Sequence, residues 1–433
     1  MEKIYLISLG CPKNLVDSEN IMAILGEKNY VLTDSAKDAD IIIVNTCAFL
    51  KAAVMESKTA IKQLVSYKKH KSQKLVVCGC LVQRYGEKLF NIHGIDGIAG
   101  PGNPEKVAEV VELVKENSGV VSFTSASGLK NTGTPRLVST YPYTYLKISE
   151  GCDNFCSYCL IPQLRGRLQS RKSTDIVREA KSLLAMGLKE LILIAQDTTH
   201  YGWDKGDKNG LEQLLLQLVK TGFPWIRLMY AHPAHITEGL LEIIAREKNV
   251  CRYLDIPLQH IHPEILKKMN RPVIDYSRLI DNIRKTVPDI RLRTSFIVGF
   301  PGEKRQHFKH LLDFVKEKRF DRVGVFRYSR EKGTPAYNLT GHLKEATKLK
   351  RERYLMDVQK KISEEKLKRL VGQKLRVLIE GIKGDYYTAR TEFDAPEIDG
   401  MVYLKKNKKY RPGDFCTVTI VSSTVHDLFA IYP

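Results

Sequence analysis

Short apolar runs alternate with segments of helical spacing through the first part of the chain. Four of these runs are typical of buried strands: Lys3–Leu9, Ile41–Thr46, Lys74–Cys78 and Gly94–Ala99. Asn103-Pro104-Glu105 has the residues of a helix start, namely an N-cap, a proline in the first turn and an acidic side chain. This order of elements predicts a doubly wound parallel sheet with helices on both faces.

The same alternation starts again near residue 142 and continues to about residue 342. Six apolar runs predict strands: Thr144–Ser149, Glu190–Ala195, Trp225–Tyr230, Cys251–Ile256, Arg291–Val298 and Arg322–Arg327. Helical patterns lie between them. Because a closed barrel of this kind has eight strand–helix units, six units predict an open, partial (β/α)6 barrel.

The last part of the chain has a different pattern. Residues 343–369 predict a long charged helix, after which short strands are separated by turns. Four of these strands are expected at Lys374–Glu380, Tyr386–Thr391, Met401–Tyr403 and Phe415–Ser422. They predict a small antiparallel, OB-like β-barrel, a type of module that often binds nucleic acid.

The pattern therefore predicts an α/β multidomain protein. Residues 119–141 are rich in Ser, Thr, Gly and Pro, which is typical of a linker. The expected division is residues 1–118 for the first domain, 119–141 for the linker, 142–369 for the partial barrel with its connecting helix, and 370–433 for the small β-barrel.

Composition indicates a globular protein of the cytoplasm. Of the 433 residues, 43% are hydrophobic and 27% are charged, as in soluble domains. The sequence predicts neither a signal peptide nor a membrane span. The nine cysteines are an odd number and cannot all be paired. Clustered thiols without an export signal indicate metal ligands in a reducing compartment.

The net charge of +20 is unevenly distributed, because residues 119–342 alone carry +13. A positive field of this size favours an anionic partner such as RNA. A generally basic, soluble surface explains the same charge equally well. The near-neutral C-terminal module argues against strong phosphate binding by that module alone.

The most informative stretch contains three thiols within eight residues, Cys152, Cys156 and Cys159. A structural zinc site would require a fourth Cys or His nearby, and the next cysteine is Cys251. Three thiolates can instead hold three corners of a four-iron cluster and leave one iron open. An open iron can bind a small molecule, so this stretch predicts a site of chemistry.

Three other cysteines follow predicted strands of the first domain. Cys11, Cys47 and Cys80 each come where a parallel strand ends, which is the edge of such a sheet that binds ligands. They can therefore meet at one crevice and hold a second cluster. The alternative is that they are core cysteines, because free cysteines are often buried. Cys78, which lies beside Gly79, is interpreted as a core thiol.

Polar residues mark the same rim of the predicted partial barrel. Gln196 and Asp197 follow the second strand, Gln259 follows the fourth, and Arg293 lies on the fifth. Their common placement predicts a ligand site, although Asp197 could also cap a helix. Beyond these groups, the basic residues from Arg165 to Lys172 either guide an anionic substrate or form a solvated turn. No side-chain general base is assigned.

The CxxxCxxC spacing resembles the signature of radical S-adenosylmethionine (SAM) enzymes. Along its whole length, the chain resembles the radical-SAM methylthiotransferases, which join a three-cysteine domain, a partial barrel and a C-terminal TRAM barrel. The resemblance is carried by these stretches: Ser8 through Glu19, Asn45-Thr46-Cys47, Gly79-Cys80, and Glu150 through Arg171.

The resemblance implies SAM and two [4Fe-4S] clusters as cofactors. One cluster would be held by Cys11, Cys47 and Cys80, and the other by Cys152, Cys156 and Cys159. Tyr158 would lie near the adenine of SAM, Gln196 and Asp197 near its amino group, and Arg293 near its carboxylate. The resemblance also implies two SAM-dependent steps, radical activation of a C–H bond and methyl transfer to sulfur.

Within the family, Pro12-Lys13, Ile161-Pro162, Arg165-Gly166 and Ser170-Arg171 are similar to one branch. That branch adds a methylthio group to the β-carbon of an aspartate in the twelfth small-subunit ribosomal protein. The implied partners are this protein or the assembling subunit, ribosomal RNA, and an electron donor such as flavodoxin or ferredoxin, with no membrane.

Two other functions stay open. One is methylthiolation of an adenosine in tRNA, although that branch usually has Gln-Met at positions 12 and 13. The other is a non-catalytic RNA-binding metalloprotein, which would contain zinc or no metal and would not cleave SAM.

Overall fold

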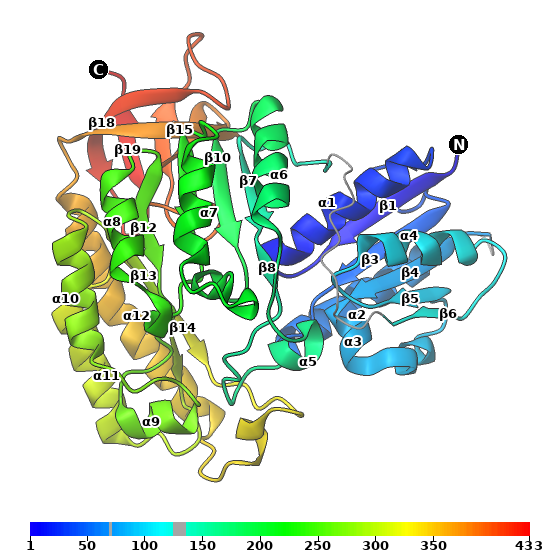
Figure 1. Ribbon diagram of the computed structural model, residues 1–433, viewed down its shortest axis with the longest axis horizontal. Helices are drawn as coiled ribbons and strands as arrows, with labels where there is room; N and C mark the ends of the chain where they lie inside the picture. Colours follow the sequence, from blue (N-terminus) through cyan, green and yellow to red (C-terminus); the bar gives the residue numbers. More distant parts are fainter. Residues whose placement is uncertain (69–71, 124–135) are drawn as a thin grey trace.

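The computed structural model describes residues 1–68, 72–123 and 136–433. Three bodies can be distinguished in Figure 1: an N-terminal lobe, a central lobe and a C-terminal barrel. The N-terminal lobe lies beside the central lobe, and the C-terminal barrel lies across one end of the central lobe. None of the helices in the described ranges is long and apolar enough to cross a membrane.

The N-terminal lobe is a six-stranded parallel sheet in the order β2-β1-β3-β4-β5-β6. Its strands are β1 (Lys3–Ser8), β2 (Val31–Leu32), β3 (Ile41–Thr46), β4 (Lys74–Gly79), β5 (Gly97–Ala99) and β6 (Val120–Ser122). Helices α1 (Pro12–Glu27) and α4 (Pro104–Leu113) pack on one face, and α2 (Lys51–Tyr67) and α3 (Cys80–Tyr85) pack on the other. The predicted doubly wound sheet is therefore confirmed.

The helix cap and the core cysteine that the sequence predicts for this lobe are both present. The side chain of Asn103 accepts a hydrogen bond from the backbone of Lys106 at 3.2 Å and caps α4. Cys78 is 1% exposed and lies in the core between the sheet and the helices α1 and α4. The interpretation of Cys78 as a core thiol is confirmed.

Two short strands differ from the sequence prediction. β2 was not expected, and β6 lies within the segment predicted as linker. A strand of two or three residues is too short to show an alternating pattern, and β6 is held by its pairing with β5 and by the packing of Val120 on the core beside α4. Residues 124–135, which form most of the predicted linker, lie outside the described residues.

The central lobe contains an open sheet of six parallel strands in the order β14-β13-β12-β11-β10-β7. They are β7 (Tyr143–Lys147), β10 (Glu190–Ile194), β11 (Trp225–Leu228), β12 (Val250–Asp255), β13 (Arg291–Val298) and β14 (Arg322–Arg327). The predicted partial barrel is confirmed, and its six strands agree with the predicted runs to within one or two residues at each end.

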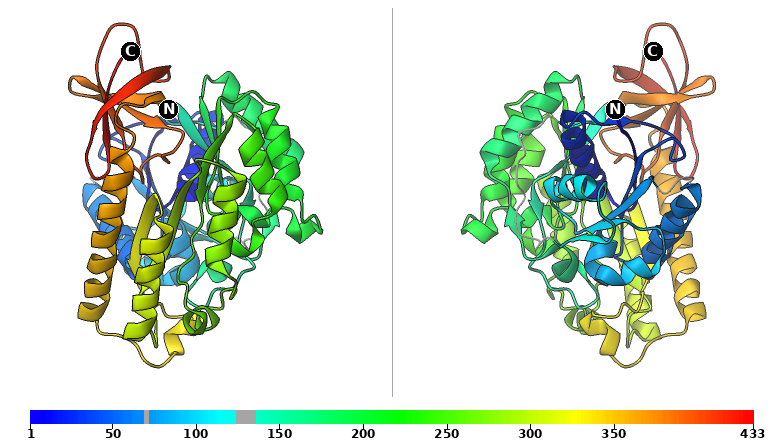
Figure 2. Two further views of the ribbon diagram at one scale, coloured as in Figure 1. Left: turned by 90° about the vertical axis from the view of Figure 1, so that its left-hand side faces the viewer. Right: turned by 90° about the vertical axis from the view of Figure 1, so that its right-hand side faces the viewer.

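Helices cover the outside of the central sheet, as Figure 1 and Figure 2 show. They are α6 (Ser173–Ala185), α7 (Gly210–Val219), α8 (Glu238–Arg246), α9 (Pro263–Lys268), α10 (Tyr276–Thr286) and α11 (Arg305–Lys318). The long helix α12 (Glu345–Lys368) runs beside β14 and leads into the C-terminal barrel. A short helix, α5 (Ile161–Arg165), and a two-strand ribbon, β8 (Ser149–Glu150) with β9 (Gln169–Ser170), flank the CxxxCxxC loop.

The C-terminal barrel is closed by five strands in the order β15-β16-β17-β19-β18. They are β15 (Lys374–Lys383), β16 (Tyr386–Thr391), β17 (Val402–Lys405), β18 (Phe415–Ser423) and β19 (Leu428–Ile431). The predicted small barrel is confirmed, with one difference: β19 was not predicted, and it pairs parallel to β17. The barrel is therefore antiparallel in all its strand pairs except that one.

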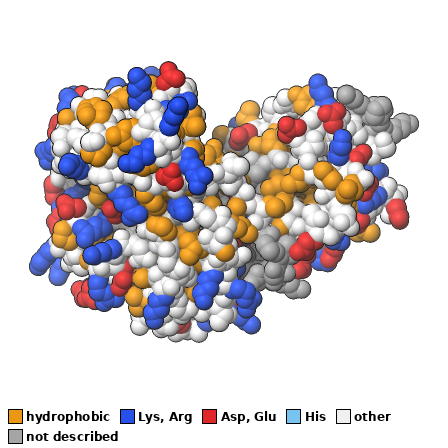
Figure 3. All heavy atoms as spheres, turned by 90° about the horizontal axis from the view of Figure 1, so that it is seen from above, with side chains coloured by type: hydrophobic (Ala, Val, Ile, Leu, Met, Phe, Trp, Pro, Cys, Tyr) orange, Lys and Arg blue, Asp and Glu red, His pale blue; other side chains and the backbone are white. Residues whose placement is uncertain are grey.

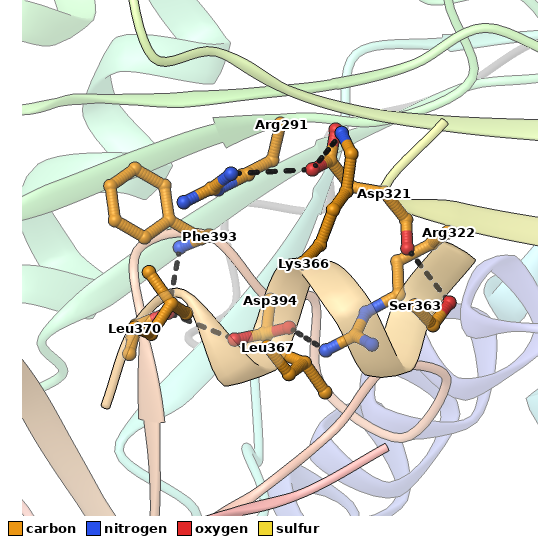
Figure 4. Close-up of a pocket in the computed structure, with 10 residues that line it drawn as sticks. Arg291, Asp321, Arg322, Ser363, Lys366, Leu367, Leu370, Phe393 and Asp394 are labelled. Atoms are coloured by element: carbon orange, nitrogen blue, oxygen red, sulfur yellow. Dashed lines mark hydrogen bonds and ion pairs between the residues drawn. The ribbon is translucent and has the colours of Figure 1, made fainter. Parts of the chain in front are cut away.

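The C-terminal barrel packs against the amino ends of the central strands. Figure 4 shows part of this contact, where Arg322 at the start of β14 forms an ion pair with Asp394 at 2.6 Å. Nearby, Lys366 of α12 pairs with Asp321 at 2.7 Å. The opposite, carboxyl end of the central sheet is left to the loops that face the N-terminal lobe.

A second contact holds the N-terminal and central lobes together. Glu331, which is 2% exposed and follows β14, accepts hydrogen bonds from the backbone of Lys51 and from Arg84, both at 2.7 Å. Lys51 is the first residue of α2, so the carboxylate lies where the positive end of a helix dipole favours an anion.

Candidate active site between two lobes

The three cysteines of the N-terminal lobe lie at the carboxyl edge of its sheet, as predicted. Cys11 is the N-cap of α1, Cys47 follows β3, and Cys80 is the first residue of α3. The pKa of the Cys80 thiol is raised to about 11, mainly by burial. The nearby Cys11 and Cys47 also raise this pKa, and Arg165 lowers it. The strand ends therefore bring three distant thiols into one site.

Asn14 holds the loops of this trio in place. Its side-chain amide donates to the carbonyl of Leu9 at 2.8 Å and to that of Thr46 at 3.0 Å. Gly10 has a φ of 99°, and an added Cβ would lie 2.6 Å from the Cβ of Cys47. The backbone beside Cys11 is thus close against Cys47, in a position that only glycine fits.

The CxxxCxxC loop follows the ribbon strand β8 and is fixed at several points. Cys152 donates its backbone N–H to the carbonyl of Gly166 at 3.1 Å. Ser157 donates its N–H to the carbonyl of Met269 at 2.9 Å and its hydroxyl to the carbonyl of Lys268 at 2.7 Å. The residues Cys152, Cys156 and Cys159 are all partly buried.

The two trios have a donor set that suits iron–sulfur clusters. In the described part of the chain, neither trio brings its three sulfur atoms within 4.8 Å of one another. Three thiolates on one zinc ion would lie about 4 Å apart, so neither trio is arranged for a single zinc ion. Three thiolates per site would leave one iron of a four-iron cluster without a protein ligand.

Helix α5 connects the two trios. It begins two residues after Cys159, and its Leu164, together with Leu160, is buried in the same apolar core as Cys80 and Leu81 of the N-terminal lobe. Arg165, at the end of α5, donates its Nε–H to the sulfur of Cys80 at 3.2 Å. The loop of the central trio therefore leads directly onto the other trio.

Arg165 is the centre of a buried charge network at this contact. Its guanidinium pairs with Asp17 of α1 at 2.9 Å and with Glu150 of β8 at 3.0 Å, and it also donates to Asn14. Lys147 of β7 pairs with both of these carboxylates. Burial raises the pKa of Glu150, but Arg165 and Lys147 outweigh it and hold that pKa well below its usual range.

The sequence interpretation of the basic residues after Cys159 was therefore wrong for Arg165. Its side chain is 3% exposed and joins the two lobes, so it neither guides a substrate on the surface nor lies in a solvated turn. Arg171 is partly buried and pairs with Glu179 at 2.6 Å. Arg167, by contrast, is exposed, pairs with Asp153 and lies over the ring of Phe155.

Three of the predicted cofactor contacts lie around the CxxxCxxC loop. The Tyr158 ring packs edge-on to Phe300, with centroids 6.5 Å apart. Asp197 is buried and accepts hydrogen bonds from Asn154 of the loop at 2.8 Å and from Thr199 at 2.6 Å. Gln196 donates to Glu150, and its buried amide oxygen has no hydrogen-bond partner among the described residues.

Asp197 is held as a carboxylate by its neighbours. Burial alone would raise the pKa of Asp197, but the hydrogen bonds with His235 and Thr199 and the positive field of His232 and His235 together outweigh it, and the pKa is lowered. The Nδ1 of His235 lies 2.9 Å from the Asp197 carboxylate. The alternative that Asp197 caps a helix does not apply, because it makes no cap hydrogen bond to the 3₁₀ turn Thr198–His200.

The other two predicted contacts have different surroundings. Gln259 has a φ of 67° and forms a backbone bridge to β13, where Ile297 donates to its carbonyl at 2.7 Å. Arg293 lies near the amino end of β13 and pairs with Asp399 of the C-terminal barrel at 3.1 Å and with Asp255 at 3.7 Å. Arg293 is thus balanced by Asp399 of the C-terminal barrel and by Asp255, the last residue of β12.

Sequence reasoning did not assign Asn14, Asp17, Glu150 or Arg165 to the site. A signal was present for α5, because Leu160 and Leu164 have helical spacing. Arg165, which follows Leu164, could therefore have been placed at a packed contact. The acidic partners gave no such signal, because Asp17 lies 148 positions from Arg165 in the chain.

Gly151, directly before Cys152, provides a test of how tightly this loop is held. It has a φ of 75°, and an added Cβ would lie 2.0 Å from the carbonyl oxygen of Arg167. We expect Gly151→Ala to displace the loop and to lower the iron bound by the Cys152 trio at least several-fold. Iron analysis after anaerobic reconstitution, in a chain whose other trio is changed to alanine, measures this effect.

Gly187→Ala is the matched control for that variant. Gly187 also has a positive φ, of 90°, but an added Cβ would meet nothing within 4 Å. It therefore carries the backbone strain of about 1–2 kcal/mol without the collision. Equal iron content in the two variants would show that the loop tolerates displacement.

Comparison with known proteins agrees with this architecture. Residues 3–100 match the group described as Uncharacterized protein family UPF0004, residues 146–315 match the Radical SAM superfamily, and residues 371–432 match the TRAM domain. Among solved structures, a radical SAM methyltransferase, TsrM, from Kitasatospora setae has a TM-score of 0.57 over 95% of this chain and 84% of its own. At 14% identity, that likeness shows the fold alone.

Curated relatives match the chain from end to end. A protein from Thermoanaerobacter sp. (strain X514), named ribosomal protein uS12 methylthiotransferase RimO, is 46% identical over 100% of both chains. A protein of the same name from Clostridioides difficile (strain 630) is 47% identical over 99% of this chain and 98% of its own.

Proposed function

Because the chain belongs to the RimO family of ribosomal protein uS12 methylthiotransferases, we propose that it adds a methylthio group to the β-carbon of an aspartate in that ribosomal protein. The observation that carries this proposal is the pair of cysteine trios, joined by α5, at the contact between two lobes. Each predicted domain also contains one of the three matched regions.

The six cysteines are the proposed ligands of two [4Fe-4S] clusters. Cys152, Cys156 and Cys159 would hold the cluster that binds SAM, and Cys11, Cys47 and Cys80 the cluster that handles sulfur. When bound, the clusters and SAM supply the one-electron chemistry that removes hydrogen from carbon, and the sulfur and methyl groups that are added.

The residues of the chain itself bind and orient the reactants. We propose that Asp197 and the unpartnered oxygen of Gln196 bind the amino group of SAM, with Tyr158 and Gln259 beside its nucleoside. Arg293 is left out of this set, because Asp255 and Asp399 already balance its charge. The buried Arg165 network holds the loop of the Cys152 trio against the N-terminal lobe and would keep the two cluster sites in a constant orientation.

The proposed partners follow from the same assignment. The chain would meet uS12 in the small ribosomal subunit or its precursor, receive electrons from a carrier such as flavodoxin or ferredoxin, and contact ribosomal RNA. Seen from above in Figure 3, Lys and Arg side chains are spread over the larger, left-hand part of the surface and are mixed with acidic ones. Such a surface supports diffuse attraction to RNA and does not form one concentrated patch.

The proposal is tested with the full chain, reconstituted under anaerobic conditions with iron and sulfide. We expect about eight irons per chain, release of 5′-deoxyadenosine from SAM, and a methylthio mass increase on the target aspartate of uS12. Mass spectrometry of tRNA nucleosides, prepared from the same cells, is the control for the related tRNA chemistry. Methylthioadenosine in tRNA with unmodified uS12 would contradict the proposed substrate, and zinc without SAM cleavage would contradict the reaction.

A further inference from the structure

Lys13 of the N-terminal lobe lies in a position that the proposed reaction leaves unexplained. It follows Cys11 by two residues, yet its ammonium group reaches the central lobe and donates to the carbonyl of Ala195 at 3.1 Å. Ala195 comes directly after β10 and directly before Gln196. The Lys13 side chain therefore spans from one proposed cluster site to the rim of the proposed SAM site.

The ammonium group of Lys13 is partly buried and has unused hydrogen-bonding capacity. It lies 4.2 Å from the centre of the Tyr230 ring, a cation–π contact that provides no hydrogen-bond acceptor. An ammonium group has three N–H donors, and among the described residues the hydrogen bond to Ala195 uses one of them. Partial burial of a charge in this way is costly unless an anion accompanies it.

Acidic side chains of the chain itself do not supply that anion. Among the described residues, no carboxylate oxygen lies within 4.0 Å of the Lys13 ammonium group. Asp255 pairs with Arg293 instead, and Asp197 pairs with His235. Asp255 is nearby, since Lys13 contributes to its pKa, but its Oδ2 accepts from the backbone of Tyr230 at 3.2 Å. The charge of Lys13 is therefore available to a bound ligand.

Tyr230, the residue under the ammonium group, is held in a strained conformation. Its φ is 60°, in the left-handed region that a bulky side chain rarely adopts. Its carbonyl accepts from the backbone of Thr198 at 3.1 Å, and Asp255 binds its N–H, so the neighbouring loops enforce this geometry. Strain that is kept in place by surrounding contacts is typical of binding sites.

On the basis of the proposed function, we propose that Lys13 binds the carboxylate of the substrate aspartate and selects aspartate over uncharged residues. The carbon to be modified is bonded directly to that carboxylate. An aspartate held by Lys13 would therefore present its β-carbon between the Cys11 trio and the rim that begins at Gln196. An uncharged adenosine would leave the ammonium group unpaired at the same position.

The test compares two peptides that differ in one group, the uS12 segment with its target aspartate and the same segment with asparagine. A hydrogen bond to a charged group contributes about 1.5–3 kcal/mol, which is roughly 10- to 100-fold in affinity. We expect the cluster-loaded wild-type chain to bind the aspartate peptide tighter by this factor in fluorescence anisotropy. In Lys13→Met, the two peptides should bind with equal affinity, measured on preparations matched to the wild type in iron content.

Two further variants separate recognition from a structural role. Lys28→Met removes the same charge from an exposed position at the end of α1 and should keep the full preference for aspartate. Lys13→Arg retains the charge and should keep most of it. If Lys13→Met still binds the aspartate peptide more tightly than the asparagine peptide, the inference is wrong. This includes the case in which the affinity for both peptides falls by the same factor.

These outcomes differ from a failure of the proposed function. A wild-type chain that cleaves SAM but neither binds nor modifies the aspartate peptide would contradict the uS12 substrate itself, and the role of Lys13 would be rejected with it. A wild-type chain that modifies the peptide, together with an unchanged preference in Lys13→Met, would contradict only the inference about Lys13.

Discussion

Replacement of Arg165 by methionine is expected to reduce the free energy of unfolding by about 3–5 kcal/mol, the loss typical of breaking a buried ion pair. The substitution leaves the carboxylates of Asp17 and Glu150 buried with one cation, Lys147, instead of two. It also removes the N–H donor to the sulfur of Cys80, which stabilises a metal-bound thiolate. We therefore expect lower iron occupancy of the Cys11 trio as well.

Arg167→Met is the matched control, because it removes the same group two positions away. Arg167 is 69% exposed, and its ion pair with Asp153 should contribute at most about 1 kcal/mol. Thermal unfolding by circular dichroism and iron analysis after reconstitution would measure both effects. Equal behaviour of the two variants would show that the buried network is not important for the contact between the lobes.

Replacement of Arg390 by methionine should have an effect of similar size at the other end of the central lobe. Arg390 of the C-terminal barrel pairs with Glu190 at the start of β10 and with Glu380 of its own barrel, and Glu190 also pairs with Arg227. The side chains of Glu190, Arg227 and Arg390 are completely buried. Loss of Arg390 leaves more buried negative charge than the remaining arginine can balance, which should cost about 3–5 kcal/mol.

The expected readout is separation of the C-terminal barrel from the central lobe. Limited proteolysis should cut Arg390→Met between the two bodies faster than the wild type, and calorimetry should show an earlier, separate transition. Lys383→Met, at an exposed position on β15, provides the control for loss of one positive charge from the same barrel. A variant that unfolds like this control would contradict the role assigned to the buried pairs.

The fold was largely predictable from the sequence because its core strands are either continuous apolar runs, as in β3, or alternate between buried and partly exposed residues, as in β13. β3 and β13 were predicted with the bounds that the structure has, since each is an uninterrupted strand pattern next to clear turns. β6 and β19 were missed for the opposite reason. Three or four residues carry too little pattern to be recognised as a strand.

The site was predictable only where spacing or strand ends carried the information. The strand ends placed Cys11, Cys47 and Cys80 at one edge, as the structure confirms. One partner of each arginine could not be foreseen, because Asp17, which pairs with Arg165, and Asp399, which pairs with Arg293, lie in other lobes, more than a hundred positions away. Whether an arginine serves a ligand or an ion pair depends on those neighbours, and a local pattern does not contain them.

The contact of Glu331 with Lys51 and Arg84 has a consequence for how this architecture can evolve. The contacts of Glu331 and Arg165 fix the orientation of the N-terminal and central lobes through side chains. The covalent connection between Ser122 and Tyr143 is therefore not needed to fix that orientation. Natural insertions and deletions should therefore accumulate in that connection across lineages, whereas Glu331 and Arg165 should be inherited with little change.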